Sequence, residues 1–425
     1  MIELGLSRVT ALLRERPLRW KAIHIAGTNG KGSVAAYVSA LLHRTGVRVG
    51  RFTSPHLIDR WDCITLDQRP VEKAAFVDAE ASVKFRDERE QIHATEFEIL
   101  TATAFELFNR HGMQVGVIEC GLGGLRDATN VLAPNDVLVS VITKVGLDHQ
   151  DLLGSSVEAI TYEKAGIVKK NVPIVVDGSN AAIVREMVRR RAAELDAPLH
   201  ESSHSIIAGY QTRETSKLAH HQKDNLSLAV LAFEVAKARL KGPTATPINI
   251  AQQPVHSFDL DSVVSEVQRE WRGRLQWLSI EQVTGRKDKV LLDGAHNTQS
   301  AEVLRDFVET HLRSGNEPRS LTWVLAMKSG KDVQGVLPII LNQKDNVVTC
   351  EFGPVDGMPW VKSCPAPELA DAAAPFTDGK IVPGQSLKHA IQTAAGIAGE
   401  KGPLVIAGSL YLVSDVLRLL ERGHT

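Results

Sequence analysis

The feature that most constrains this chain is a repeated alternation of short apolar runs with longer helical patterns. The apolar runs of the first half are rich in Val and Ile and occupy residues 21–26, 116–120, 137–143 and 173–177. Helical patterning follows them, most clearly over 31–44 and 155–169. Strands of a parallel sheet are buried on both faces and read as nearly continuous apolar runs that alternate with helices. The pattern therefore predicts an α/β fold.

A glycine-rich loop, Gly27-Thr28-Asn29-Gly30-Lys31-Gly32-Ser33, joins the first expected strand to its helix. Phosphate oxygens need several converging backbone N–H groups, and glycines permit the close approach and the positive φ. The helix N-terminus adds partial positive charge, Lys31 is placed to reach the β- and γ-phosphates, and Ser33 to bind Mg²⁺. The loop is not a strict Walker A sequence, because Gly32 separates the lysine from the serine. The pattern predicts a phosphate-binding loop; the alternative is a turn that only starts a helix.

Three further groups in the first half follow expected strands or lie on the next helix. Glu119 ends a strand, and an acid at that position faces the crevice in which α/β folds bind ligands and suits Mg²⁺; the alternative is an acid in solvent. His149 follows another strand and is either a metal ligand or a structural histidine, with the structural role favoured from the residues alone. Lys164, within Glu163-Lys164-Ala165-Gly166, by itself fits the solvent face of a helix.

The alternation restarts in the second half, with apolar runs over 290–293, 321–327, 347–352 and 404–407. Arg274, the segment Asp293-Gly294-Ala295-His296 and Ser409 lie next to these runs, where they either contact a ligand or form polar turns. Three prolines between residues 241 and 256 suggest a surface loop near a boundary. We expect a P-loop-type N-terminal domain with a mostly parallel sheet over residues 1–271. A smaller, Rossmann-like α/β C-terminal domain is expected over 272–425.

The balance of charged residues indicates which kinds of molecule the chain binds. The 425 residues carry 49 Lys and Arg against 50 Asp and Glu, so neither nucleic acid nor a membrane surface is expected as a partner. Small molecules in a local site fit better. The four cysteines lack metal-ligand spacing and suit a reducing compartment, and neither a secretory signal nor a membrane span is visible. We expect a cytoplasmic monomer, with a mitochondrial pool left open by the basic stretch 14–21.

Taken together in one order, the motifs resemble the folylpolyglutamate synthase/dihydrofolate synthase family, which belongs with the Mur-type ATP-dependent amide ligases. The matching segments are HIAGTNGKGS from His24, TSPHL from Thr53, TEFE from Thr95, IECGLGG from Ile118, LDHQDLLG from Leu147, EKAGI from Glu163, GRL from Gly273, LDGAHN from Leu292 and AGSLY from Ala407. The opening IELGLSRVTALL and the segment GMPW from Gly357 look like the fungal-type dihydrofolate synthase branch.

The resemblance implies a reaction in which ATP phosphorylates the carboxylate of dihydropteroate and L-glutamate then displaces phosphate. It implies that the loop from Gly27 to Ser33 binds the triphosphate and that Asn225, Arg274 and Asp293 contact ATP. Two Mg²⁺ sites are implied, the first held by Ser33 and Glu119 and the second by Glu119, His149 and a carbamylated Lys164. His296 and Ser409 would lie on the glutamate or phosphate side, and Thr95 and Asp127 in the pterin pocket. The two domains would close over the cleft.

The chain departs from the family pattern in three places. Leu125-Arg126 stands where the family has arginine before leucine, Leu218-Ala219-His220-His221 lacks the usual glycine, and only part of an Asp-Lys-Asp segment survives at Ser329-Gly330-Lys331-Asp332.

Two alternatives to a dihydrofolate synthase remain open. One is a folylpolyglutamate synthase that adds glutamates to reduced folates, and the other is a P-loop nucleotide-binding module without ligase activity.

Overall fold

The chain folds into two compact units. The computed structural model describes residues 5–14, 17–208, 213–242, 259–270, 272–314 and 319–422. The first unit comprises Met1–His56 and Trp61–Glu270, and the second comprises Leu57–Arg60 and Trp271–Thr425. The segment Leu57–Arg60 thus belongs with residues far along the chain. Most of the proline-containing stretch 241–256, predicted as a surface loop, lies outside the described residues.

The first unit is built on an eight-stranded sheet with the order β4-β3-β2-β5-β1-β6-β7-β8. Its strands are β1 (Lys21–Ala26), β2 (Val49–Phe52), β3 (Ile64–Leu66), β4 (Arg69–Pro70), β5 (Val115–Glu119), β6 (Val137–Ile142), β7 (Ile174–Val176) and β8 (Leu199–Glu201). Central β1 pairs in parallel with both β5 and β6. The β2–β3 and β3–β4 pairs are antiparallel, an edge that the apolar runs did not predict.

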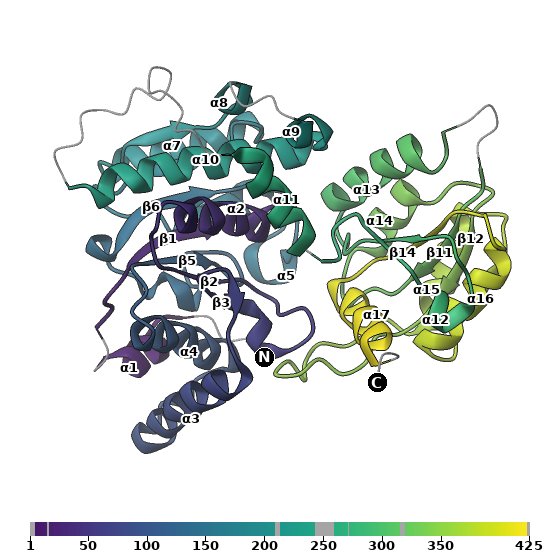
Figure 1. Ribbon diagram of the computed structural model, residues 1–425, viewed down its shortest axis with the longest axis horizontal. Helices are drawn as coiled ribbons and strands as arrows, with labels where there is room; N and C mark the ends of the chain where they lie inside the picture. Colours follow the sequence, from purple (N-terminus) through teal and green to yellow (C-terminus); the bar gives the residue numbers. More distant parts are fainter. Residues whose placement is uncertain are drawn as a thin grey trace. The chain divides into compact units, whose positions relative to one another are not determined.

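Helices cover both faces of this sheet, and Figure 1 places α2 and α10 on one face and α1, α3 and α4 on the other. The helices of the first unit are α1 (Ser7–Leu13), α2 (Lys31–Arg44), α3 (Lys73–Glu90), α4 (Glu96–Arg110), α5 (Gln150–Leu153), α6 (Val157–Ala165), α7 (Ala182–Glu194), α8 (Ser205–Ala208), α9 (Arg213–Lys217), α10 (His220–Leu240) and α11 (Leu260–Glu270). Trp20 meets Phe105 and Phe108 of α4 edge to face, at centroid distances of 5.0 and 5.4 Å. Such aromatic pairs each add about 0.5–1.5 kcal/mol beyond their burial, so they anchor α4 beneath the sheet.

The second unit has a six-stranded sheet with the order β13-β12-β11-β14-β10-β9. Its elements are β9 (Gln276–Leu278), α12 (Glu281–Thr284), β10 (Val290–Leu292), α13 (Thr298–His311), β11 (Thr322–Leu325), α14 (Val333–Ile340), β12 (Asn346–Thr349), α15 (Ala366–Ala373), β13 (Ile381–Pro383), α16 (Leu387–Ala398), β14 (Leu404–Ala407) and α17 (Leu410–Arg422). All pairs are parallel except β9–β10. The predicted α/β alternation is therefore confirmed in both units. Over the described ranges, no helix is both long and apolar enough to span a bilayer.

A buried ion pair fixes the start of β12. The carboxylate of Asp345 is fully buried and receives both terminal nitrogens of Arg313, at 2.9 and 2.5 Å. The indole Nε1 of Trp323 donates to the same carboxylate at 2.9 Å, and the backbone N–H groups of Leu321 and Asn342 donate at 2.9 and 3.0 Å. Removal of the Asp345 charge leaves the buried guanidinium of Arg313 with only the 45% exposed carboxylate of Glu309, 3.1 Å from its Nε, as a counter-charge.

We therefore expect Asp345→Asn to lower the free energy of unfolding of the second unit by about 3–5 kcal/mol. Urea unfolding followed by tryptophan fluorescence measures this change, since Trp323 contacts the site. Asp306→Asn is the matched control, because that carboxylate is 73% exposed in its pair with Arg305. The control should cost less than about 1 kcal/mol. Equal unfolding midpoints for the two variants would contradict the assignment.

Candidate active site

The glycine loop between β1 and α2 is bound to the neighbouring strand. Gly30 adopts a left-handed conformation with φ 88° and caps α2, so the first N–H groups of the helix open toward the loop. The backbone N–H groups of Thr28 and Asn29 donate to the carbonyl of Lys144 at 2.7 and 3.1 Å. The hydroxyl of Thr143 donates to the carbonyl of Asn29 at 2.7 Å. Residues that follow β6 therefore hold the loop at the carboxyl edge of the sheet.

Two glycines of this loop leave no space for a side chain. A Cβ at Gly27 would lie 1.8 Å from Oγ1 of Thr143, and one at Gly30 would lie 2.2 Å from Oδ1 of Asn225. Asn225 is buried on α10, and its amide fills the place where a Cβ of Gly30 would lie. The structure thus brings Asn225, predicted from the resemblance to contact ATP, directly against the predicted phosphate loop.

A cation and a carboxylate face each other beside the loop. Lys31 begins α2, and its Nζ lies 3.7 Å from Oε1 of Glu119 and 3.2 Å from the carbonyl of Thr28. Glu119 ends β5, the other strand next to β1, and is 4% exposed. The backbone N–H of Ser54 donates to its second oxygen at 3.4 Å. Ser33 lies in the first turn of α2, so the predicted Mg²⁺ ligands Ser33 and Glu119 belong to adjoining elements.

Lys164 is a buried lysine on α6 that reaches the loop. Its Nζ donates to the carbonyl of Gly27 at 2.8 Å, and the residue is 4% exposed. Burial and, to a smaller extent, the positive charge of Lys31 lower the pKa of Lys164 to about 7. The interpretation of this lysine as a solvent-facing residue, which the residues alone favoured, is therefore wrong.

The segment before α5 carries His149 and Asp148. His149 has a φ of 50° and precedes α5, and its side chain is 38% exposed. Asp148 is more deeply placed at 10% exposed, and its charge raises the pKa of Lys164 against the effect of burial. Sequence reasoning selected the histidine of this motif and passed over its acid. The available signal was an acid in the segment that follows an expected strand, next to the selected histidine.

Thr95 and Asp127 have structural partners. Thr95 caps α4 in a capping box with Glu98, in which its N–H donates to the Glu98 carboxylate at 2.7 Å and its Oγ1 accepts at 3.3 Å. The carboxylate of Asp127 accepts from the N–H of Leu122 at 2.8 Å and from the N–H and hydroxyl of Thr129 at 3.0 and 2.5 Å. Burial raises the pKa of Asp127, and these hydrogen bonds oppose the rise. Both residues shape the loops near Glu119, and their contact with a pterin stays a prediction.

The exchanged pair Leu125-Arg126 packs against the helix that carries Lys164. Arg126 pairs with Glu163 of α6 at 2.7 Å, and the N–H of Leu125 donates to the Glu163 carbonyl at 2.7 Å. A Cβ at Gly166 would lie 2.4 Å from Cβ of Leu125. The exchange therefore places Leu125 over a glycine and turns Arg126 toward an acid on α6.

The second unit gathers its own polar cluster at the carboxyl ends of β10 and β14. Asp293 follows β10, and its carboxylate accepts from the N–H of Leu275 at 2.7 Å. Burial raises the pKa of Asp293, and the positive charge of Arg274 opposes that rise. The Nδ1 of His296 donates to a backbone carbonyl at 2.8 Å. Ser409 follows β14, which pairs in parallel with β10, so Asp293 and Ser409 leave the same edge of the sheet.

Comparison with known proteins identifies the family. Family profiles described as "Mur ligase middle domain" and "Dihydrofolate synthetase, C-terminal domain" match residues 25–230 and 276–419. The chain is 35% identical to a probable dihydrofolate synthetase of Schizosaccharomyces pombe, with 99% of each chain covered. The chain belongs to the dihydrofolate synthetase family. The resemblance drawn from the motifs is thus confirmed, and with it the class of ATP-dependent ligases.

Solved structures of family members share the fold. Folylpolyglutamate synthase of Mycobacterium tuberculosis, complexed with ADP and AMPPCP, is 26% identical with a TM-score of 0.76, covering 98% of this chain and 95% of that one. A bifunctional folylpolyglutamate synthase/dihydrofolate synthase with Mn, AMPPNP and L-glutamate bound is 25% identical with a TM-score of 0.75, covering 99% and 95%. The predicted fold class, a P-loop-type sheet domain plus a Rossmann-like α/β domain, is confirmed.

The close approach of the loop to α10 makes a testable prediction for this family member. Gly30→Ala should weaken ADP binding by roughly tenfold or more, because the new methyl displaces Asn225 and the loop loses hydrogen bonds of about 1 kcal/mol each. Gly46→Ala is the control, since Gly46 also has a positive φ (81°) but no atom lies within 4 Å of its Cβ position. Both variants carry a backbone strain of about 1–2 kcal/mol, so the control shows whether such strain elsewhere in the fold affects ADP binding. Calorimetric titration with ADP measures the difference, and equal affinities would refute the role of the contact.

Proposed function

We propose that this chain is a dihydrofolate synthase, which joins L-glutamate to 7,8-dihydropteroate with ATP and releases ADP and phosphate. The observation that carries the proposal is the convergence of a phosphate loop, a Lys31–Glu119 pair and a buried Lys164 at one sheet edge. The full-length similarity to a probable dihydrofolate synthetase supports the choice of acceptor acid. A single chain is proposed as the working enzyme, since every proposed ligand residue lies within it.

The reaction requires activation of a poor electrophile. A carboxylate oxygen of dihydropteroate attacks the γ-phosphorus of ATP, the bond to ADP breaks, and an acyl phosphate forms. The glutamate amine then attacks the acyl carbon, phosphate leaves with the C–O electron pair, and the amine loses a proton. Positioned donors and cations lower both barriers by stabilising the charge that develops on oxygen. We assign these tasks to the loop from Gly27 to Ser33, through the ammonium of Lys31 and the backbone N–H groups at the start of α2, since those of Thr28 and Asn29 already donate to the carbonyl of Lys144.

The donors around the loop suit Mg²⁺. Glu119 supplies a buried carboxylate and Ser33 a hydroxyl, both hard oxygen donors of the kind that Mg²⁺ prefers. Ser33 and Glu119 would hold the ion, which would supply positive charge to offset the negative charge of the phosphates. We propose that His149 and Lys164 serve a second Mg²⁺ site together with Glu119. Mn²⁺ in a bifunctional relative supports a divalent ion in this family.

Carbamylation would turn Lys164 into an oxygen ligand. An ammonium cannot ligate a cation, but a neutral amine reacts with CO₂ to give a carbamate and a proton. With a pKa of about 7, Lys164 has a neutral amine at physiological pH, which an ordinary lysine does not. We propose that this lysine is carbamylated in the active enzyme.

In the second unit, we propose that Arg274 and Asp293 contact ATP and that His296 and Ser409 bind glutamate or the transferred phosphate.

ADP release by the purified protein tests the function. With MgATP and L-glutamate present, we expect ADP to form with 7,8-dihydropteroate and not with tetrahydrofolate or without an acceptor. Turnover with tetrahydrofolate as well would establish a bifunctional or polyglutamylating enzyme, as in the relative that carries both activities. An equal rate of ADP release with and without either acceptor would indicate a nucleotide hydrolase and would refute the ligase assignment.

Glu119→Gln tests the metal site. The substitution keeps the volume but removes the charge, and we expect ligation to fall by at least about 100-fold, as when one positioned charge-stabilising group is lost. Circular dichroism should remain unchanged. Glu158→Gln, an exposed acid on α6, serves as the control and should retain full activity. Wild-type turnover in Glu119→Gln would remove this residue from the mechanism.

The depressed pKa of Lys164 makes carbamylation depend on pH. Below pH 7 most of the amine is protonated and inert, and above pH 7 most of it is neutral and able to react with CO₂. About a tenth of it is reactive at pH 6 and about nine tenths at pH 8. Enzyme freed of CO₂ should therefore lose activity and, at equal concentrations of dissolved CO₂, regain it faster at pH 8 than at pH 6. Carbon-13 NMR with labelled bicarbonate should show a carbamate that is missing in Lys164→Ala. No carbamate signal in active wild-type enzyme would disprove the modification.

A further inference from the structure

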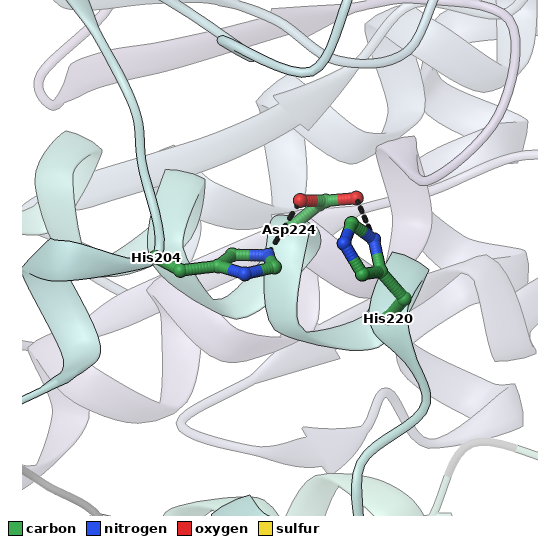
Figure 2. Close-up of side chains that lie close together, drawn as sticks. All are labelled: His204, His220 and Asp224. Atoms are coloured by element: carbon green, nitrogen blue, oxygen red, sulfur yellow. Dashed lines mark hydrogen bonds and ion pairs between the residues drawn. The ribbon is translucent and has the colours of Figure 1, made fainter.

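Two histidines and an aspartate meet at the start of α10, away from the ligands assigned above. Figure 2 shows the rings of His204 and His220 on either side of the carboxylate of Asp224. His204 Nε2 lies 2.7 Å from one carboxylate oxygen, and His220 Nδ1 lies 3.3 Å from the other. One ligand atom from each of the three residues can be chosen so that all lie within 4.8 Å of one another.

The local fold explains why these groups converge. His220 is the first residue of α10 and Asp224 lies four residues later, so both side chains project from the same helix face. His204 follows β8 and immediately precedes α8, and its ring lies 4.7 Å from the ring of His220, centroid to centroid. Two ligands therefore come from α10 and the third comes from the segment before α8. A pair of side chains on one helix could not supply this third ligand.

From this geometry we propose a binding site for a divalent transition-metal ion, with Zn²⁺ as the reference ion, formed by His204, His220 and Asp224. Two imidazole nitrogens and one carboxylate oxygen are ligands that Zn²⁺ and its first-row neighbours accept, unlike Mg²⁺, which prefers oxygen donors. Metal–ligand bonds of about 2.0–2.2 Å place such atoms roughly 3–3.5 Å apart, so side-chain rotations would bring the three ligand atoms, now within 4.8 Å of one another, onto one ion. The site differs from the proposed Mg²⁺ site in both its residues and its chemistry.

The surroundings favour a cation with open coordination positions. Asp224 is 16% exposed, His204 40% and His220 80%, so water reaches the histidine side of the cluster. Three protein ligands with room for water describe an accessible site rather than a closed structural one. Burial raises the pKa of Asp177, and the charge of Asp224 adds to that rise while Lys144 opposes it, so Asp177 and Asp224 interact electrostatically.

Occupation of this site would link the turn before α8 to the first turn of α10. Asn225 follows Asp224 directly and contacts the loop at Gly30. A bound metal would therefore hold the part of α10 from which the proposed ATP contact projects. His220 belongs to the segment in which this chain departs from the family pattern, so the site is a property of this chain rather than of the shared phosphate chemistry.

Calorimetric titration of the metal-free full-length protein with Zn²⁺, in excess Mg²⁺, tests the proposal. We expect one equivalent to bind to the wild type, and Co²⁺ to give the absorption of an ion with nitrogen ligands. His204→Ala, His220→Ala and Asp224→Asn should each weaken Zn²⁺ binding by at least about 100-fold, since loss of an outer-shell partner alone costs about 10–100-fold. Zn²⁺ should also raise the Tm of the wild type but not of these variants.

Two control variants separate this site from others. His389→Ala removes an exposed histidine of α16 and should leave Zn²⁺ binding unchanged. His149→Ala removes a proposed ligand of the other metal site and should also retain it. Because the side chain of His220 is 80% exposed, His220→Ala keeps the test valid even if another variant misfolds. Absence of Zn²⁺ binding, binding that survives His220→Ala, or binding lost in His149→Ala instead would each overturn the proposal.

Discussion

The close contact of the loop at Gly27 and Gly30 with its neighbours is the constraint on which the rest of the first unit depends. Strands β5, β1 and β6 are adjacent and parallel, so their carboxyl ends open at one edge. The loop that leaves β1 is pressed between residues following β6 and the amide of Asn225 on α10. Neither glycine has room for a methyl group. The loop is therefore held in a conformation in which the N–H groups of Thr28 and Asn29 donate to the carbonyl of Lys144 and α2 begins directly after Gly30.

This packing also sets the electrostatics of the site. Lys164 is buried because its Nζ reaches the carbonyl of Gly27, and burial beside Lys31 removes much of its affinity for a proton. Glu119, at the end of β5, and Asp148, in the segment between β6 and α5, supply the opposite charge. A buried lysine is costly to stability unless it is paired, and Lys164 is paired with the carbonyl of Gly27. A lowered pKa beside charged neighbours is typical of functional sites.

Much of this arrangement could be predicted from the sequence, because its cause is local. The alternation of apolar runs with helical patterns predicted both sheets, and the glycines between the first strand and its helix predicted the loop. The antiparallel edge β2–β3–β4 was missed because its strands are only two to four residues long and carry little periodicity. The segment Leu57–Arg60 was assigned to the first domain, since nothing in four residues reveals that they pack with residues far along the chain.

Side-chain roles were harder to predict where a structural and a functional use share one pattern. Thr95 and Glu98 form the spacing of a capping box, which the resemblance alone would assign to a pterin pocket. Burial of Lys164 and of Asp127 depends on which helix or loop covers them, and spacing along the chain does not contain that information.

The departures from the family pattern are explained by where they lie. Arg126 is 48% exposed in its pair with Glu163, and His220 is 80% exposed, whereas Glu119 and Lys164 are each 4% exposed. Arg126 and His220 thus lie at the surface, whereas Leu125 packs over Gly166 and Leu218 is buried. Arg126 pairs with Glu163 of α6, and His220 is the first residue of α10. Both helices carry a residue that touches the loop, Lys164 and Asn225 respectively. The segments that depart from the family pattern therefore lie next to the two helices that support the glycine loop.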